Sequence, residues 1–106
     1  MQEELKVDMD WRPPKSWLDY WESNCKRLLH MFSTASLRKI KKEKSEHGYH
    51  FRFILWNPVD DEYALLWQFL LGDDRVRCKL NYWRWKAGIK DWNKLWKCKV
   101  GRDNGK

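Results

Sequence analysis

The chain of 106 residues has no long apolar run and no paired cysteine motif. None of its hydrophobic runs approaches the ~20 residues that a helix needs to span a bilayer. The N-terminus, MQEELKV, is acidic and polar, which is not typical of a secretory signal. The three cysteines, Cys25, Cys78 and Cys98, are widely spaced and form no CxxC pair. This spacing indicates neither a disulfide framework nor a zinc site, and it favours a reducing, cytoplasmic setting.

Positive charge is concentrated in the last third of the sequence. The net charge is +7, and residues 75–106 hold 11 Lys or Arg and 2 Asp, whereas residues 1–74 hold 11 Lys or Arg and 13 acidic residues. Five aromatic residues are interleaved with these C-terminal cations: Tyr82, Trp83, Trp85, Trp92 and Trp96. Cations neutralise phosphates, and flat rings stack on unpaired bases for ~1–3 kcal/mol each. The pattern favours single-stranded DNA or RNA as a partner; the alternative is a basic surface over tryptophan-filled packing.

The first third predicts a strand followed by a helix. Apolar and charged residues alternate over Glu4–Asp10, which is typical of a strand, and two prolines end it. Over Ser16–Phe32 the apolar residues recur at helical spacing, and Ser16 suits the N-cap. The predicted buried stripe of this helix consists of Trp17, Trp21, Cys25, Leu28 and Phe32.

The middle of the chain predicts a β-hairpin. Ala35–Lys44 is rich in lysine, which suits an edge strand because charge discourages pairing between sheet edges. A turn over Ser45–Gly48 leads into a second strand, Tyr49–Trp56. Alternation divides this strand into an apolar face and a face that carries His50, Arg52, Ile54 and Trp56.

The remaining chain predicts a helix that starts at Asn57-Pro58 and ends at Gly72, and then a strand over Arg75–Trp83. Residues 89–100 suit a helix and a strand equally well. One domain over residues 1–106 is therefore expected, with an α+β core in the order β-α-β-β-α-β over residues 4–83. This order is the ferredoxin-like or RRM-like sandwich. Residues 84–106 form a basic, tryptophan-rich C-terminal appendage.

In such a sandwich one face of the sheet stays free of helices. Alternation places on it a set of polar residues from three strands: Asp8, Asp10, His50, Arg52, Arg77, Lys79 and Asn81. Two carboxylates at i and i+2 on one strand can hold Mg²⁺ or Mn²⁺, and the histidine and the cations could then grip a triphosphate. The alternative without a site is that Asp8 and Asp10 lie at a solvated strand end and that His50 is hydrogen-bonded within the sheet.

Short motifs resemble those of the archaeo-eukaryotic primase superfamily. Asp8-Met9-Asp10 resembles its DxD motif, the segment Ser45–His50 resembles its second motif, and Leu71–Asn81 is similar to the approach to its third. The resemblance implies an RRM-like catalytic palm, with Asp8 and Asp10 as metal ligands and Ser45 and His50 as nucleotide contacts. Asn81 stands where a third carboxylate is expected, and a neutral amide is a weaker ligand for a hard cation.

Three functions therefore remain open. The preferred hypothesis is a small primase-like domain that binds single-stranded nucleic acid. Its predicted contacts are Ser45, Arg52, Arg75, Arg77, Lys79, Trp83, Trp85 and Lys86. The second hypothesis is an active metal-dependent nucleotidyltransferase or nuclease that uses Asp8, Asp10 and His50. The third is a protein-interaction module whose exposed tryptophans dock onto a partner.

Overall fold

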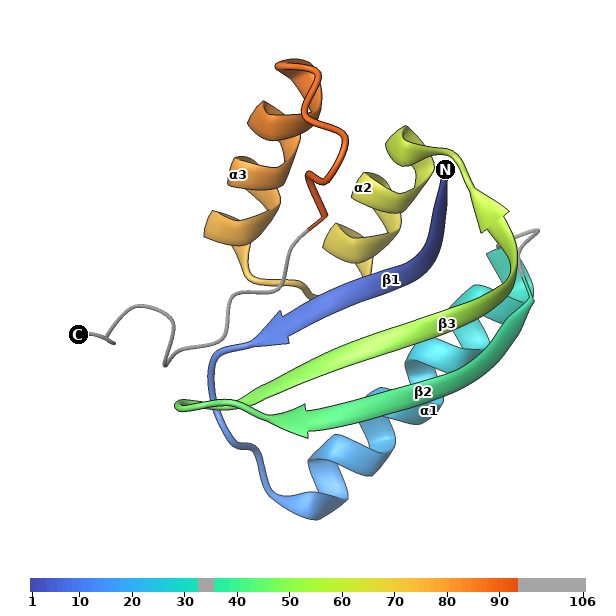
Figure 1. Cartoon of the computed structure of the whole chain (residues 1–106). Helices are drawn as coiled ribbons and strands as arrows, with labels where there is room; N and C mark the ends of the chain where they lie inside the picture. Colours follow the sequence, from blue (N-terminus) through green and yellow to red (C-terminus); the bar gives the residue numbers. More distant parts are fainter. Residues whose placement is uncertain (33–35, 94–106) are drawn as a thin grey trace.

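The computed structural model describes residues 1–32 and 36–93, and it shows an α+β fold of three strands and three helices in these residues. The elements are β1 (Gln2–Met9), α1 (Lys15–Phe32), β2 (Leu37–Lys44), β3 (Tyr49–Val59), α2 (Asp61–Leu70) and α3 (Arg75–Lys86). β3 lies between the other two strands in an antiparallel sheet of order β1-β3-β2. In Figure 1, α1 lies behind the sheet, and α2 and α3 run next to each other on the β1 side.

The predicted fourth strand is wrong, because Arg75–Trp83 lies within helix α3. Asp74 caps this helix, and its carboxylate accepts a hydrogen bond from the backbone N of Arg77 at 3.1 Å. The residues of α3 that are buried, Arg77 and Asn81, are four apart, as one helix face requires. The ferredoxin-like or RRM-like order β-α-β-β-α-β over residues 4–83 is therefore corrected to β-α-β-β-α-α.

Side chains occupy the outer edge of β1, where a fourth strand would have paired. Lys6 N donates to Oε1 of Gln68 at 2.9 Å, and Asp8 N donates to Oδ1 of Asp73 at 2.7 Å. The Lys6 carbonyl accepts a hydrogen bond from Nη1 of Arg77 at 3.1 Å. These bonds satisfy the backbone groups of an edge strand and protect the edge from pairing with another chain.

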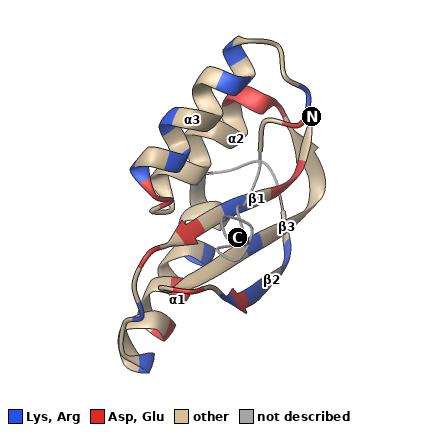
Figure 2. Ribbon diagram, turned by 60° about the vertical axis from the view of Figure 1, so that its left-hand side comes forward, with Lys and Arg blue, Asp and Glu red and all other residues tan. Residues whose placement is uncertain are grey.

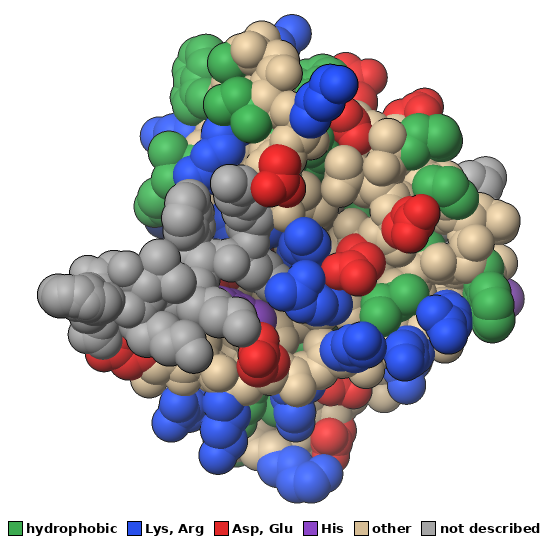
Figure 3. Space-filling view, viewed as in Figure 1, with side chains coloured by type: hydrophobic (Ala, Val, Ile, Leu, Met, Phe, Trp, Pro, Cys, Tyr) green, Lys and Arg blue, Asp and Glu red, His purple; other side chains and the backbone are tan. Residues whose placement is uncertain are grey.

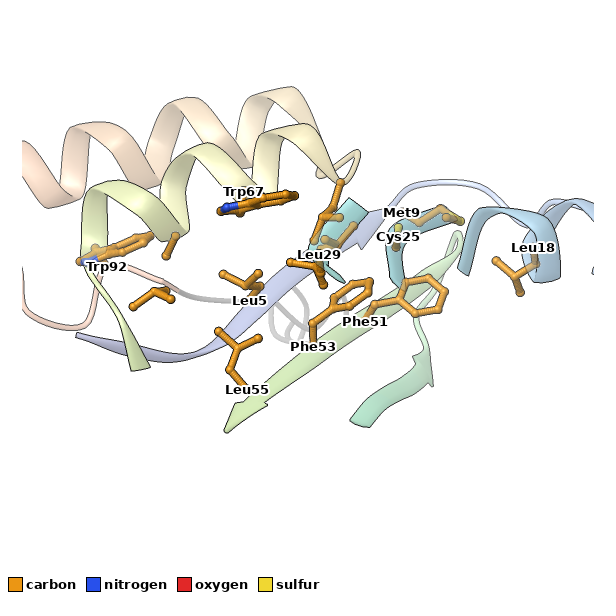
Figure 4. Close-up of a cluster of buried hydrophobic side chains, with 14 residues drawn as sticks. Leu5, Met9, Leu18, Cys25, Leu29, Phe51, Phe53, Leu55, Trp67 and Trp92 are labelled. Atoms are coloured by element: carbon orange, nitrogen blue, oxygen red, sulfur yellow. The ribbon is translucent and has the colours of Figure 1, made fainter. Parts of the chain in front are cut away.

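The core lies between the sheet and the helices, on the sheet face that alternation predicted. Its buried strand residues are Leu5, Val7, Met9, Phe51, Phe53, Leu55 and Val59. Figure 4 shows Trp67 of α2 and Leu29 of α1 packed over this face. The inward face predicted for both strands is confirmed.

Helix α1 is confirmed, but its buried stripe differs from the predicted one. Leu18, Cys25 and Leu29 are buried, whereas Trp17 and Leu28 are exposed. Trp17 instead packs edge-on against Trp11, with 5.0 Å between ring centroids. Trp21 and Cys25 of the predicted stripe do face the sheet, and the Trp21 ring lies 4.6 Å from that of Phe51, whereas the Trp11–Trp17 pair lies outside the core.

The connection from β3 to α2 also differs. β3 continues through Asn57 and Pro58 to Val59, and the helix begins at Asp61 after an extended N-cap at Asp60. The strand extends because Val59 is buried in the core and pairs with Gln2. The predicted start at Asn57-Pro58 is therefore wrong.

Smaller predictions can also be compared with the structure. The lysine-rich edge strand is confirmed as β2. Gly72 was predicted to cap the end of α2; the cap residue is Leu71, and Gly72, with φ 103°, follows it directly. No helix in the described parts of the chain is long and apolar enough to cross a membrane. For the undecided stretch 89–100, the structure shows no helix or strand over residues 89–93, and residues 94–100 lie outside the described residues.

Candidate functional site

The sheet face opposite the helices carries a row of three cations. The register of the sheet pairs Arg52 of β3 with Lys6 of β1 on one side and with Lys41 of β2 on the other. We call Lys6, Arg52 and Lys41 the cationic row. Like charges placed directly opposite one another destabilise a sheet. Figure 3 shows Lys and Arg side chains gathered over the middle of this face.

The cationic row is only partly neutralised by the protein. Arg52 Nη1 lies 3.2 Å from Oε1 of Glu4, and Lys6 Nζ donates to the Asn93 carbonyl at 2.7 Å. Burial, and then the neighbouring Arg52, lowers the pKa of Lys6 below its ordinary value. Glu4 forms an ion pair with Arg52, and the negative charge of Asp91 also acts on Lys6. Such an arrangement can accept a further anionic group.

A histidine–carboxylate pair lies one row further along the sheet. His50 of β3 faces Asp8 of β1 and Glu43 of β2, and its Nε2 is 3.5 Å from Oδ1 of Asp8. His50 is 5% exposed, and burial lowers its pKa while burial raises the pKa of Asp8. The structure therefore brings together two of the residues predicted to be catalytic.

The third predicted catalytic residue, Asp10, lies beyond the end of β1 and is exposed. In the described chain there is no group of three or more His, Cys, Asp or Glu side chains that could hold a metal ion. Mg²⁺ and Mn²⁺ favour several oxygen ligands, so Asp8 and Asp10 do not make a complete metal site with the described residues. Their metal-binding role stays a prediction.

A polar hollow and an exposed ring extend the cationic row. Lys41, Glu43, His50 and Arg52 contribute to a hollow of about 490 Å³ between β2 and β3. Further along β3, Trp56 is 66% exposed, and the Arg38 guanidinium lies 5.4 Å from the centre of its ring. An exposed ring beside cations can stack on a base.

Lys6, Lys41 and Trp56 were missed as binding residues. Alternation alone places Lys6 and Trp56 on the polar face of their strands, so a signal for them was present. Lys41 could not be placed in the same way, because its position opposite Arg52 depends on the register between two strands.

Two predicted contacts have structural roles. Ser45 closes the turn between β2 and β3, and its hydroxyl accepts a hydrogen bond from Gly48 N at 3.2 Å. Arg77 was predicted to face the nucleic acid but is buried, since its guanidinium bonds to Asp73 and, at 2.9 Å, to Oδ1 of Asn93. Asn81, expected beside them, is buried in α3.

The remaining predicted contacts lie on α3 and not on a strand. Arg75, Lys79, Trp83 and Lys86 are exposed, and Trp85 is half-buried. The structure therefore separates the predicted nucleic-acid residues into two groups. Arg52 belongs to the sheet face, and these five belong to a helix.

The primase-like motifs are dispersed in the same way. Asp8 and His50 meet on the sheet, Ser45 closes a turn, and Asn81 lies inside a helix. No family model, no curated protein and no solved structure matches the chain.

Proposed function

We propose that the sheet face that carries the cationic row binds single-stranded nucleic acid. The observation that carries this proposal is the cationic row of Lys6, Arg52 and Lys41. Neighbouring strands are ~4.8 Å apart, so three cationic side chains leave the sheet within ~10 Å of one another. A phosphate backbone supplies anions at short intervals and releases counterions when cations neutralise it.

An exposed aromatic ring favours a single strand over a duplex as the ligand. Trp56 offers an exposed ring beside Arg38, and stacking on such a ring requires an unpaired base. The lysines of the edge strand β2 continue the positive surface beyond the row. A strand of nucleic acid that crosses the sheet would meet cations first on β2 and then on β3 and β1.

The test is fluorescence anisotropy with a labelled single-stranded oligonucleotide over a series of salt concentrations. We expect binding at low salt that weakens steeply as salt rises. Arg52→Gln and Lys41→Gln should each weaken binding and reduce the salt slope by about one ion. Trp56→Ser should weaken binding about tenfold through lost stacking, with little change in the slope.

The matched control is Lys26→Gln, which removes one exposed cation from α1, away from the sheet. Its salt slope should stay close to that of the unmodified protein. The proposal fails if no oligonucleotide binds at low salt, or if Lys26→Gln weakens binding as much as Arg52→Gln does.

We propose no catalytic function as a second candidate. The histidine–carboxylate pair of His50 and Asp8 could position a proton, but the described residues add no third metal ligand and no further group that faces a reacting atom. The nucleotidyltransferase hypothesis stays a prediction from the short motifs.

A further inference from the structure

Helix α3 has its polar side inside and its apolar side outside. The buried residues are Arg77 and Asn81, whereas Val76 is 65%, Leu80 44% and Trp83 62% exposed. Spacings of four and three residues place Val76, Leu80 and Trp83 along one stripe. A surface helix of a globular protein normally directs such a stripe into its own core.

Helix α2 adds exposed apolar side chains beside Trp83, whereas Val76 and Leu80 line a neighbouring hollow. Leu66, Phe69 and Leu70 are each more than half exposed. Between the two helices lies a groove of about 680 Å³, to which α2 contributes Phe69 and α3 contributes Tyr82. Exposed apolar surface gathered in one place marks an interaction site far more often than isolated exposed residues do.

The rim of this groove is positively charged. Arg75 and Lys79 line it from α3, which contains no acidic residue, and Glu62 is the acidic residue that lines it from α2. Lys86 continues the same helix and lies 5.2 Å from the centre of the Trp85 ring. Figure 2 shows positive charge along α3.

The positive charge of the rim limits which kinds of partner can bind in the groove. A second copy docked symmetrically would bring two sets of Arg75 and Lys79 together, which is unfavourable. The C-terminal stretch 94–106 holds five Lys or Arg and one Asp, so its charge also matches poorly. A partner with apolar and acidic side chains fits both the groove and its rim.

We propose that the groove between α2 and α3 binds an acidic amphipathic helix of a partner protein. The apolar stripe of that helix would lie against Phe69, Tyr82 and Trp83, and its carboxylates would face Arg75 and Lys79. This is the helix-in-groove mode of recognition. It uses a surface other than the sheet face and is independent of nucleic-acid binding.

The probe is a pool of peptides of about 18 residues, or five helical turns. Each carries Leu, Phe or Trp at i, i+3, i+4 and i+7, with Glu or Asp on the other positions. A matched pool has Lys or Arg in place of the acidic residues. We expect selection on the full chain to enrich binders from the acidic pool and not from the basic pool.

Substitutions test whether the selected peptides bind in this groove. Trp83→Ser should weaken the selected peptides about tenfold or more, as expected for the loss of an aromatic anchor. The matched control Trp56→Ser removes a tryptophan of similar exposure from the sheet and should leave peptide binding unchanged. Arg75→Gln with Lys79→Gln should abolish the preference for acidic over uncharged versions of the same peptide.

Four outcomes would overturn the proposal: no enrichment from the acidic pool, equal enrichment from both pools, equal losses in Trp83→Ser and Trp56→Ser, or a dimer in sedimentation that Trp83→Ser dissociates. The proposed function has a separate readout, because Trp56→Ser should weaken the oligonucleotide and Trp83→Ser should not.

Discussion

At the scale of single residues, a buried polar cluster replaces a strand. Arg77 is buried with Asp73, and the two side chains hold backbone groups of Lys6 and Asp8. A buried ion pair adds little net stability, but removing one partner costs ~3–5 kcal/mol because the other charge is left unpaired. The value of this pair therefore lies in fixing α3 to β1 in one position.

His50 makes the stability of the protein depend on pH. Burial lowers its pKa below the usual 6.5, against the opposing effects of Asp8 and Glu43. The unfolded chain therefore binds a proton below pH ~6.5, while the folded chain takes it up only at lower pH. The contribution of neutral His50 is fully present above pH 6.5 and is lost as the pH falls below it.

We expect urea unfolding to show a falling free energy of unfolding between about pH 7 and about pH 5, and a smaller fall in His50→Gln. Asp8 acts in the opposite sense, because burial raises its pKa, so the folded state retains that proton longer as the pH rises. Asp8→Asn should therefore steepen the loss on acidification. Identical pH slopes for His50→Gln and the unmodified protein would show that His50 is not the group responsible.

At the scale of elements, the outer edge of β1 decides the fold. Gln68 is buried on α2 and accepts the hydrogen bond of Lys6 N. Gln68→Met keeps the length of the side chain but removes this acceptor, so a buried donor is left unpaired. We expect a loss of about 1–3 kcal/mol in the free energy of unfolding. Hydrogen exchange at the Lys6 amide should accelerate more than at other amides of β1.

The internal control is the Val7 amide, which alternation directs towards β3 and away from the edge. Its exchange should change only by the global loss of stability. If the Lys6 and Val7 amides accelerate equally, Gln68 acts through general packing and not through the edge bond.

The sequence predicted correctly those elements whose residue pattern fits only a helix or only a strand. Alternation over β1 and β3 and helical spacing over α1 each agree with the structure. The stretch Arg75–Trp83 fits both a helix and a strand, because Val76, Cys78, Leu80 and Tyr82 alternate with polar residues as they would in a strand. The choice depends on Gln68, Asp73 and Arg77 satisfying β1, which are contacts between distant segments that a local pattern does not contain.

The candidate site was predictable to a similar extent. The pairing of Asp8 with His50 followed from placing β1 beside β3, and this neighbourhood is confirmed. The cationic row depends on the register that sets Lys41 against Arg52, and the sequence alone does not specify it. Arg77 was misplaced because its segment was assigned to a strand.

At the scale of the whole molecule, two surfaces of different chemistry lie on different elements. The sheet face presents cations and one exposed tryptophan, and the α2–α3 groove presents apolar side chains with a basic rim. The net charge of +7 favours solubility despite the exposed apolar residues. The two proposals concern different surfaces, so a nucleic acid and a partner protein would not compete for one site.

The outward stripe of α3 should contribute little to the stability of the fold. Replacing Val76, Leu80 and Trp83 together by Gln removes apolar surface that the described chain does not bury. Because exposed substitutions usually change stability by under ~0.5 kcal/mol each, we expect a combined change below about 1.5 kcal/mol. Fluorescence of a hydrophobic dye with the folded protein should fall, since the dye binds exposed apolar surface. A loss of several kcal/mol in urea unfolding would instead show that the stripe, Trp83 included, packs within the molecule.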